Sequence, residues 1–308
     1  MAEQKKLGVI AAFATLCLVW SSTWLVIKIG LADLPPISFA AIRFLIAFVV
    51  LVAVSIGRVS LWPKTGADWL LLAFTGLLMF AMNYGLLFWG ELNVSSGLAA
   101  VLQATIPVFG MLFANWLLPA EPLRWHQVGG AAVAIAGVAL ICSRLFGHGG
   151  QMAFLGGLGI SIGGAGAAFS NVLLKRRALR LAPAMIAAWQ MIFGGLPLFS
   201  LGLFLEGNPL HFHWTGRALA CLLYLAVIGS ALTFLLLYWL LPRIPVNNLQ
   251  TISLITPPGA VAFGWLFGGE IFSLWSLVGG AFVLAGVWMI FRKPESRQAL
   301  GEASVATR

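Results

Sequence analysis

The chain has 308 residues, of which 61% are hydrophobic and only 9% are charged, whereas soluble proteins average roughly half and a quarter. This composition excludes a soluble domain, because no polar segment is longer than a short tail. The net charge of +9 would suggest a nucleic-acid partner in a soluble protein. Here the positive charges lie in loops and tails, where membrane topology needs them, so no nucleic acid is expected.

Apolar runs of about 20 residues recur along the chain, and this is the length that crosses a bilayer core of about 30 Å as a helix. They predict an all-α polytopic membrane protein with ten transmembrane helices, at residues 8–28, 37–56, 68–90, 96–118, 126–146, 153–175, 184–205, 216–240, 246–268 and 273–291. Turn formers such as Pro35-Pro36 and Asn208-Pro209 separate the spans. The first run resembles a signal peptide but continues to Ile27 without a small-residue cleavage site, so we expect it to be retained.

The second half of the chain repeats the first. Matches recur at nearly constant shifts of 147 to 150 residues: Pro36 with Pro183, Trp89 with Trp239, Gln103 with Ser253, Pro107 with Pro257, and Gly130 and Gly137 with Gly279 and Gly286. Such self-similarity indicates a duplicated unit. We expect a first five-helix repeat at 1–147, a second at 148–292 and a cytoplasmic tail at 293–308. Because five is odd, the second repeat must be inverted, which is the architecture of alternating-access transporters.

Lysine and arginine residues predict the orientation in the membrane. With the N-terminus inside, fourteen of them fall in cytoplasmic segments, and only Lys28, Arg144 and Arg217 fall on the opposite side. Positive residues are enriched in cytoplasmic loops, so both termini are expected in the cytoplasm.

Polar and aromatic side chains at membrane depth are the candidates for a substrate site, because they need partners or water there. They are Trp20, Ser22, Thr23, Trp24, Asn83, Tyr84, Gln103, Asn171, Gln250 and Ser253. Trp20 and Trp24 are one helical turn apart and share a face, which would make an aromatic wall for a cavity. The alternative is packing, with the neighbouring Ser and Thr hydroxyls bonded back to their own helix.

Two amides have open interpretations of the same kind. The Asn83 amide suits a zwitterionic substrate, but Asn also bridges helices in membranes. Gln103 has the stronger case for a substrate contact, because it shares a face with Ala99, Pro107 and Gly110, which leave room around it.

Arg43 is the one charge deep inside a predicted span. It would attract a substrate carboxylate or tie helices together, with Asp33 or Glu91 as its counter-ion. The second interpretation is favoured, because Gln190 stands at the matching position of the other repeat.

Proline residues interrupt the hydrogen bonding of two predicted spans, at Pro107, Pro257 and Pro258. The freed carbonyls would bind ligand or mark a bend. Paired bends would give each half a hinge for gating, which we favour.

The chain resembles the EamA-type drug/metabolite transporters over essentially its whole length, because several motifs occur in the order and with the repetition typical of that family. They are Trp20-Ser-Ser-Thr-Trp24 with Lys28, Arg43, Phe88-Trp89, Pro107, and Glu121 followed by Gly130 and Gly137. Within that group the chain looks most like the YddG-type amino-acid exporters. The resemblance implies a multi-pass protein of the bacterial inner membrane, with a central cavity formed by spans 1, 3, 4, 6, 8 and 9.

The expected function is export of small metabolites, most of all amino acids, by alternating access. No Asp, Glu or His lies in the middle of a predicted span, so uncoupled movement is a serious alternative to proton-coupled or ion-coupled export of drugs or other metabolites. Sugar phosphates are disfavoured, since a dianion would need more buried cations than Arg43. No HExxH motif, Ser-Lys dyad or deep carboxylate pair indicates an enzyme. We expect no cofactor, no metal and no obligate protein partner, only substrate and lipid bilayer.

Overall fold

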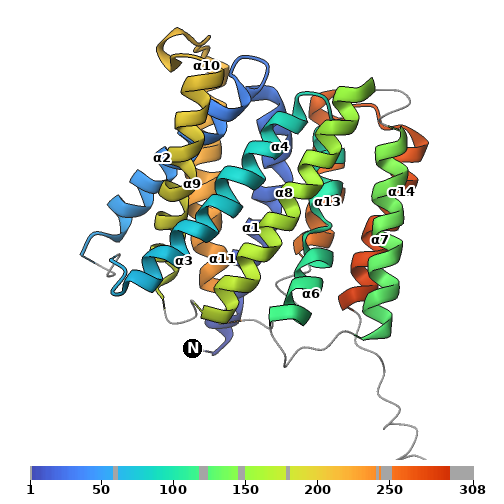
Figure 1. Ribbon diagram of the computed structural model, residues 1–308, viewed down its shortest axis with the longest axis horizontal. Helices are drawn as coiled ribbons and strands as arrows, with labels where there is room; N and C mark the ends of the chain where they lie inside the picture. Colours follow the sequence, from blue (N-terminus) through green and yellow to red (C-terminus); the bar gives the residue numbers. More distant parts are fainter. Residues whose placement is uncertain are drawn as a thin grey trace, which may run out of the picture.

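The computed structural model describes residues 2–57, 62–117, 124–144, 150–177, 181–240, 243 and 252–291. In these residues every regular element is a helix (Figure 1). Seven helical stretches are long and apolar enough to cross a membrane, and Trp125–Ile141 and Leu274–Ile290 are shorter apolar helices. The expected all-α membrane-protein class is confirmed for this part of the chain.

The helices follow the predicted spans closely. They are α1 (Ala2–Gly30), α2 (Pro36–Ser55), α3 (Gly66–Gly76), η1 (Leu77–Asn83), α4 (Tyr84–Glu91), α5 (Ser96–Gln103), α6 (Ile106–Leu117), α7 (Trp125–Arg144), α8 (Gly150–Arg177), α9 (Pro183–Leu205), η3 (Pro209–His211), α10 (Gly216–Leu223), η4 (Tyr224–Leu232), α11 (Thr233–Leu240), α13 (Ile252–Gly268) and α14 (Leu274–Phe291). Local chemistry starts several of them: Pro36 and Pro183 occupy first turns, where no amide hydrogen is needed. Thr65 and Thr215 accept hydrogen bonds from Asp68 N and Ala218 N at the starts of α3 and α10.

Two predicted spans contain π-helical segments in their middle. The span from α3 to α4 widens at η1, and the span from α10 to α11 widens at η4. Shifting the numbers of η1 by 150 places it on residues 227–233, largely within η4. Such segments are rare and are frequent at functional sites. The sequence did not predict them.

Each π-helical segment packs against a helix from the other half of the chain. Helix α2 packs along α9; α2 also contacts η4, and α9 contacts η1. Helix α1 packs against α13, and α6 packs against α8. The pair α7 and α14 lies side by side at one edge of the bundle (Figure 1).

Glycine residues set the spacing between α7 and α14. A methyl group built on Gly130 would lie 2.6 Å from the carbonyl oxygen of Gly286, and one on Gly137 would lie 2.6 Å from that of Gly279. The two backbones therefore touch at two places. Small residues permit this approach, as is common between helices in membranes.

Four carboxylates lie at one end of the bundle, which we call the acidic end: Asp33, Glu91, Glu206 and Glu270. The N-terminus lies at the opposite end (Figure 1). Asp33 accepts hydrogen bonds from Arg217 Nε at 2.9 Å and Nη2 at 2.8 Å and from Thr215 Oγ1 at 2.7 Å. These bonds from Arg217 and Thr215 lower the pKa of Asp33 to about 2, so the pair stays ionised across the neutral and mildly acidic range.

Replacing Gly130 by Ala should lower the thermal stability of the purified protein, whereas replacing Gly129 by Ala should not. The added methyl at 130 meets a backbone oxygen that cannot move aside alone, so the two helices must separate. Overpacking costs about 1–3 kcal/mol, which exceeds the ~1 kcal/mol that Ala gains over Gly in a helix. At Gly129 the nearest atom, Cε of Met289, is 3.8 Å away, so only the gain remains. Equal unfolding midpoints in detergent for the two variants would contradict the contact.

Candidate functional site

Aromatic rings from α1, η1, α4 and α11 meet in the interior, and we call them the central ring cluster: Trp20, Phe80, Tyr84 and Phe234. The rings of Trp20 and Phe234 are 5.9 Å apart, and those of Phe80 and Phe234 are 5.1 Å apart. Tyr84 stacks on Phe80 at 5.9 Å with an interplanar angle of 7°. Two of the predicted site residues, Trp20 and Tyr84, are thus brought together by rings that the sequence had not singled out.

The predicted face of α1 presents donors as well as rings. The indole Nε1–H groups of Trp20 and Trp24 are buried, and neither has a hydrogen-bond acceptor within the described ranges. Ser22 Oγ lies 2.6 Å from the Tyr224 hydroxyl, which joins α1 to η4. Ser22 and Thr23 also donate to their own helix, at Val19 O and Trp20 O. The hydroxyls are therefore partnered within the fold, while neither indole N–H has a partner among the described residues.

The amides of Asn83 and Gln103 are bonded to each other. Gln103 Nε2 donates to Asn83 Oδ1 at 2.8 Å and to Ile160 O at 3.2 Å. Both side chains are buried, with 7% of Gln103 and 4% of Asn83 exposed. The pair connects η1, α5 and α8 at the point where Gly163 of α8 lies against the backbone of Asn83. This geometry supports the bridging interpretation that the sequence left open for Asn83 and extends it to Gln103.

Arg43 is 1% exposed and bridges α2 to η4. Its Nε donates to Ser230 Oγ at 2.7 Å and its Nη2 donates to Gly229 O at 3.1 Å. The guanidinium lies over the rings of Phe44 and Tyr84 at 5.1 Å each, a favourable cation–π arrangement. A tie between helices was the favoured expectation, but neither Asp33 nor Glu91 makes the contact: the partners are a hydroxyl and a carbonyl of the π-helical segment.

The three proline residues behave differently in the two halves. Helix α5 ends at Gln103, a turn occupies Ala104–Thr105, and Pro107 lies in the first turn of α6. Pro257 and Pro258 instead lie inside the continuous helix α13. The expected interruption is therefore a visible break in the first half.

Of three further predicted residues, Asn171, Gln250 and Ser253, the structure describes the side chain of Asn171 alone. Asn171 is exposed on α8. Gln250 lies outside the described residues, and so does the side chain of Ser253. Glu121, part of the family motif, also lies outside them.

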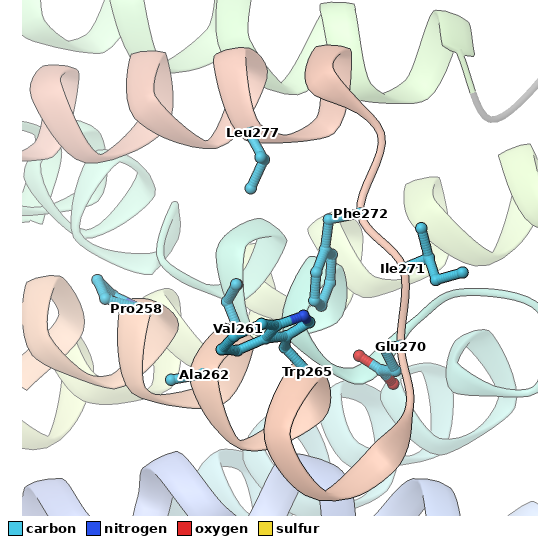
Figure 2. Close-up of a pocket in the computed structure, with 8 residues that line it drawn as sticks. All are labelled: Pro258, Val261, Ala262, Trp265, Glu270, Ile271, Phe272 and Leu277. Carbon is cyan, nitrogen blue, oxygen red and sulfur yellow. The ribbon is translucent and has the colours of Figure 1, made fainter.

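A pocket of about 420 Å³ lies between α13, α14 and the segment that joins them. Figure 2 shows Phe272 next to the indole of Trp265, with Leu277 facing them from α14. Of the predicted site residues only Pro258 lines it. None of its lining residues belongs to the central ring cluster, and Trp265 in the lining is 67% exposed.

Sequence reasoning did not predict that the charges of Lys28, Glu91 and Glu270 meet at the acidic end. Glu91 closes α4 and is 0% exposed; the sequence had suggested it only as a counter-ion of Arg43. Glu270 lies at this end in the segment that joins α13 to α14, and Lys28 lies in the last turn of α1. The signal available was that both acids stand near the ends of apolar spans on the side that has few cations.

Similar proteins are named as transporters. The chain is 30% identical over 299 residues to a probable terminal-alkyne amino-acid exporter of Streptantibioticus cattleyicolor, with 94% of each chain covered. It is 29% identical to the uncharacterized inner membrane transporter YedA of Escherichia coli K12, covering 89% of this chain and 87% of YedA. It is 24% identical to the uncharacterized transporter YoaV of Bacillus subtilis, covering 91% and 96%. A crystal structure shares the fold, with a TM-score of 0.67 over 92% of this chain and 96% of its own at 19% identity.

The helical architecture, the relatives and a family profile lead to the same class. The profile of the EamA-like transporter family matches the chain twice, at residues 6–143 and 154–292, which is most of its length. The fold and these matches define a polytopic membrane transporter. The chain belongs to the EamA-like transporter family, as the sequence motifs predicted.

Gln103→Ala and Asn83→Ala should each lower the unfolding midpoint, and the double variant should lower it by less than the sum. Loss of either amide leaves its partner buried and unpaired, at a cost of about 1–3 kcal/mol. The second loss then removes a group that has already lost its partner, so the effects are not additive.

The exposed Asn171→Ala is the control and should leave the midpoint unchanged. A Gln103→Ala variant as stable as the wild type would contradict the structural role of the pair.

Proposed function

We propose that this protein exports amino acids, including aromatic or hydrophobic ones, across the bacterial inner membrane by alternating access. The observation that carries the proposal is the pair of buried, unpartnered indole donors of Trp20 and Trp24 beside the central ring cluster. Donors of this kind suit a substrate carboxylate, and the rings suit an apolar side chain. The relative named as a probable amino-acid exporter, at 30% identity, supports the same substrate class.

The proposed site is completed by residues of both halves. Trp20, Trp24 and Tyr84 come from the first half, and Phe234 and Tyr224 come from the second. A site at the repeat interface near the midplane is the arrangement expected for alternating access. Asn83 and Gln103 would border the site as a fixed bridge, and Gln250, Ser253 and Asn171 remain proposed contacts from the second half.

Ten spans in two inverted repeats, at 1–147 and 148–292, are the proposed architecture. The packing supports it, because equivalent helices of the two halves make equivalent contacts with the other half. The contact of α2 with η4 corresponds to that of α9 with η1, and the contact of α1 with α13 corresponds to that of α8 with α6. The glycine contacts of α7 and α14 cross in the same way, since the first glycine of each helix meets the second of the other. The π-helical segments at matching positions add to this support.

The predicted loops on the same side of the membrane as the N-terminus carry most of the lysine and arginine residues. This excess supports a cytoplasmic location for both termini and for the tail 293–308. The acidic end then faces the periplasm. The name of the relative YedA, an inner membrane transporter, supports the same membrane. Bends at Pro107, Pro257 and Pro258 would act as hinges, with the first already broken at Ala104–Thr105.

The alternative is a proton-coupled or ion-coupled exporter of drugs or other metabolites. One observation favours coupling, the fully buried Glu91 at the acidic end. Sugar phosphates and nucleoside-like solutes fit less well, because Nε and Nη2 of Arg43 bond to Ser230 and Gly229 and only Nη1 remains without a partner among the described residues.

Amino-acid counterflow in proteoliposomes tests this function, with Trp20→Ala as the variant and Trp265→Ala as its control. We expect exchange of at least one aromatic or hydrophobic amino acid, and a loss of about tenfold or more in Trp20→Ala, because a substrate-facing ring and a donor disappear together. Trp265 lies in the exposed pocket, and its replacement should change little. No counterflow for any amino acid would refute the proposal, and equal losses in both variants would remove Trp20 from the site.

Compartment-specific tags test the architecture. A tag inserted after residue 146 should report from the periplasm, and a tag after residue 308 should report from the cytoplasm, because an odd number of spans separates them. The readout is a pair of reporters that are active in only one compartment each. Two tags in the same compartment would exclude inverted repeats of five.

A further inference from the structure

The turn between α4 and α5 is held from both sides by opposite charges. Lys28 of α1 donates from Nζ to Glu91 O and, at 3.0 Å, to Val94 O, at the carbonyl end of α4. Glu270 accepts from Ser96 N at 2.8 Å and from Gly97 N at 3.3 Å, at the amide end of α5. Each charge meets the helix end of opposite polarity. The two contacts join α1, α4, α5 and the segment after α13, and so hold the acidic end together.

Glu91 lies in this cluster without a hydrogen bond. Its side chain is 0% exposed, and among the described residues neither Oε1 nor Oε2 has a partner. The Ser96 hydroxyl is buried and unpartnered as well. An ionised carboxylate is costly in such a place, because burial of a charge needs compensating hydrogen bonds as well as a counter-charge.

The charged groups that act on Glu91 are Lys28, Glu270 and Arg43. The Lys28 ammonium donates its hydrogen bonds to main-chain carbonyls, and the Arg43 guanidinium donates to Ser230 and Gly229. Glu270 is held by two amide hydrogens and repels a second negative charge. Nη1 of Arg43 is buried and also lacks a hydrogen-bond partner, but among the described residues it makes no hydrogen bond or ion pair with Glu91. A proton is therefore the simplest partner left for the Glu91 carboxyl.

We propose that Glu91 is a proton-binding site: it carries a proton while the acidic end is closed, as in this structure, and can lose it when that end opens to water. Closure of the proposed periplasmic end then takes up one proton, and acid favours the closed form. The pH dependence of transport rests on the proposed function, whereas proton binding by Glu91 does not.

The first test is the unfolding midpoint in detergent as a function of pH, for the wild type, Glu91→Gln and Glu206→Gln. Glu91→Gln mimics the protonated carboxyl, so it should fold and be at least as stable as the wild type at neutral pH. A group that binds its proton more tightly when folded contributes stability at low pH and loses it as pH rises. Acidification should therefore raise the midpoint of the wild type relative to Glu91→Gln.

Glu206 is the matched control, because it is also an acid at this end but accepts hydrogen bonds from Ile37 N and Ser38 N at 2.8 and 2.7 Å. Glu206→Gln should keep the pH dependence of the wild type. A Glu91→Gln variant less stable than the wild type at neutral pH, with the gap closing in acid, would mean that Glu91 is ionised and would overturn the proposal.

The second test is counterflow at equal pH on both sides of the vesicle. Exchange by the wild type should slow severalfold as pH falls, and Glu91→Gln should be slow and independent of pH over the same range. The same pH profile in both proteins would overturn the proposal while leaving amino-acid export intact. Absence of counterflow in every variant would count against the export function alone, since the midpoints still decide the state of Glu91.

Discussion

The fold depends on how helix ends are satisfied where water is scarce. Every helix leaves main-chain donors at its start and acceptors at its end, and these need partners. At the acidic end, side chains from distant parts of the sequence supply them: Glu206 binds the start of α2, Glu270 the start of α5, and Lys28 the end of α4. Two of these three contacts join the second half of the chain to the first. Charge that would be costly in lipid thus stabilises the assembly.

Because charge gathers at the helix ends, the interior is built from rings, main chain and a few paired polar groups. Arg43 illustrates this, since it contacts a π-helical carbonyl, a hydroxyl and aromatic faces and has no direct carboxylate partner in the described part of the chain. The π-helical segment matters here, because widening the helix leaves carbonyls such as Gly229 O able to accept from outside it. The result is an aromatic interior with few charged side chains. Such an interior suits the proposed zwitterionic substrate, whose two charges balance each other.

Much of this could be predicted from the sequence, and the failures have physical reasons. Span positions follow from apolar length and from prolines at helix starts, and the family follows from motifs in a fixed order. The segments η1 and η4 could not be predicted, because they are apolar on nearly every side and so carry no periodic pattern that an extra residue would visibly shift. The pairing of Gln103 with Asn83 depends on how α5 approaches η1, which spacing alone does not give. The burial of Glu91 depends on neighbours more than 60 residues away, as its main-chain contact with Lys28 shows.

The departures from symmetry carry the remaining information about mechanism. Gln190 stands where the first half has Arg43, and it accepts from Tyr238 at 2.9 Å, so the second half replaces a charge by a neutral hydrogen bond. The first half breaks its helix before Pro107, whereas α13 runs through Pro257 and Pro258. Two identical halves would give both faces of the membrane the same gate. Here the buried carboxylate Glu91, the cation Arg43 and the broken helix all belong to the first half, so the proposed response to protons would act on one face of the membrane only.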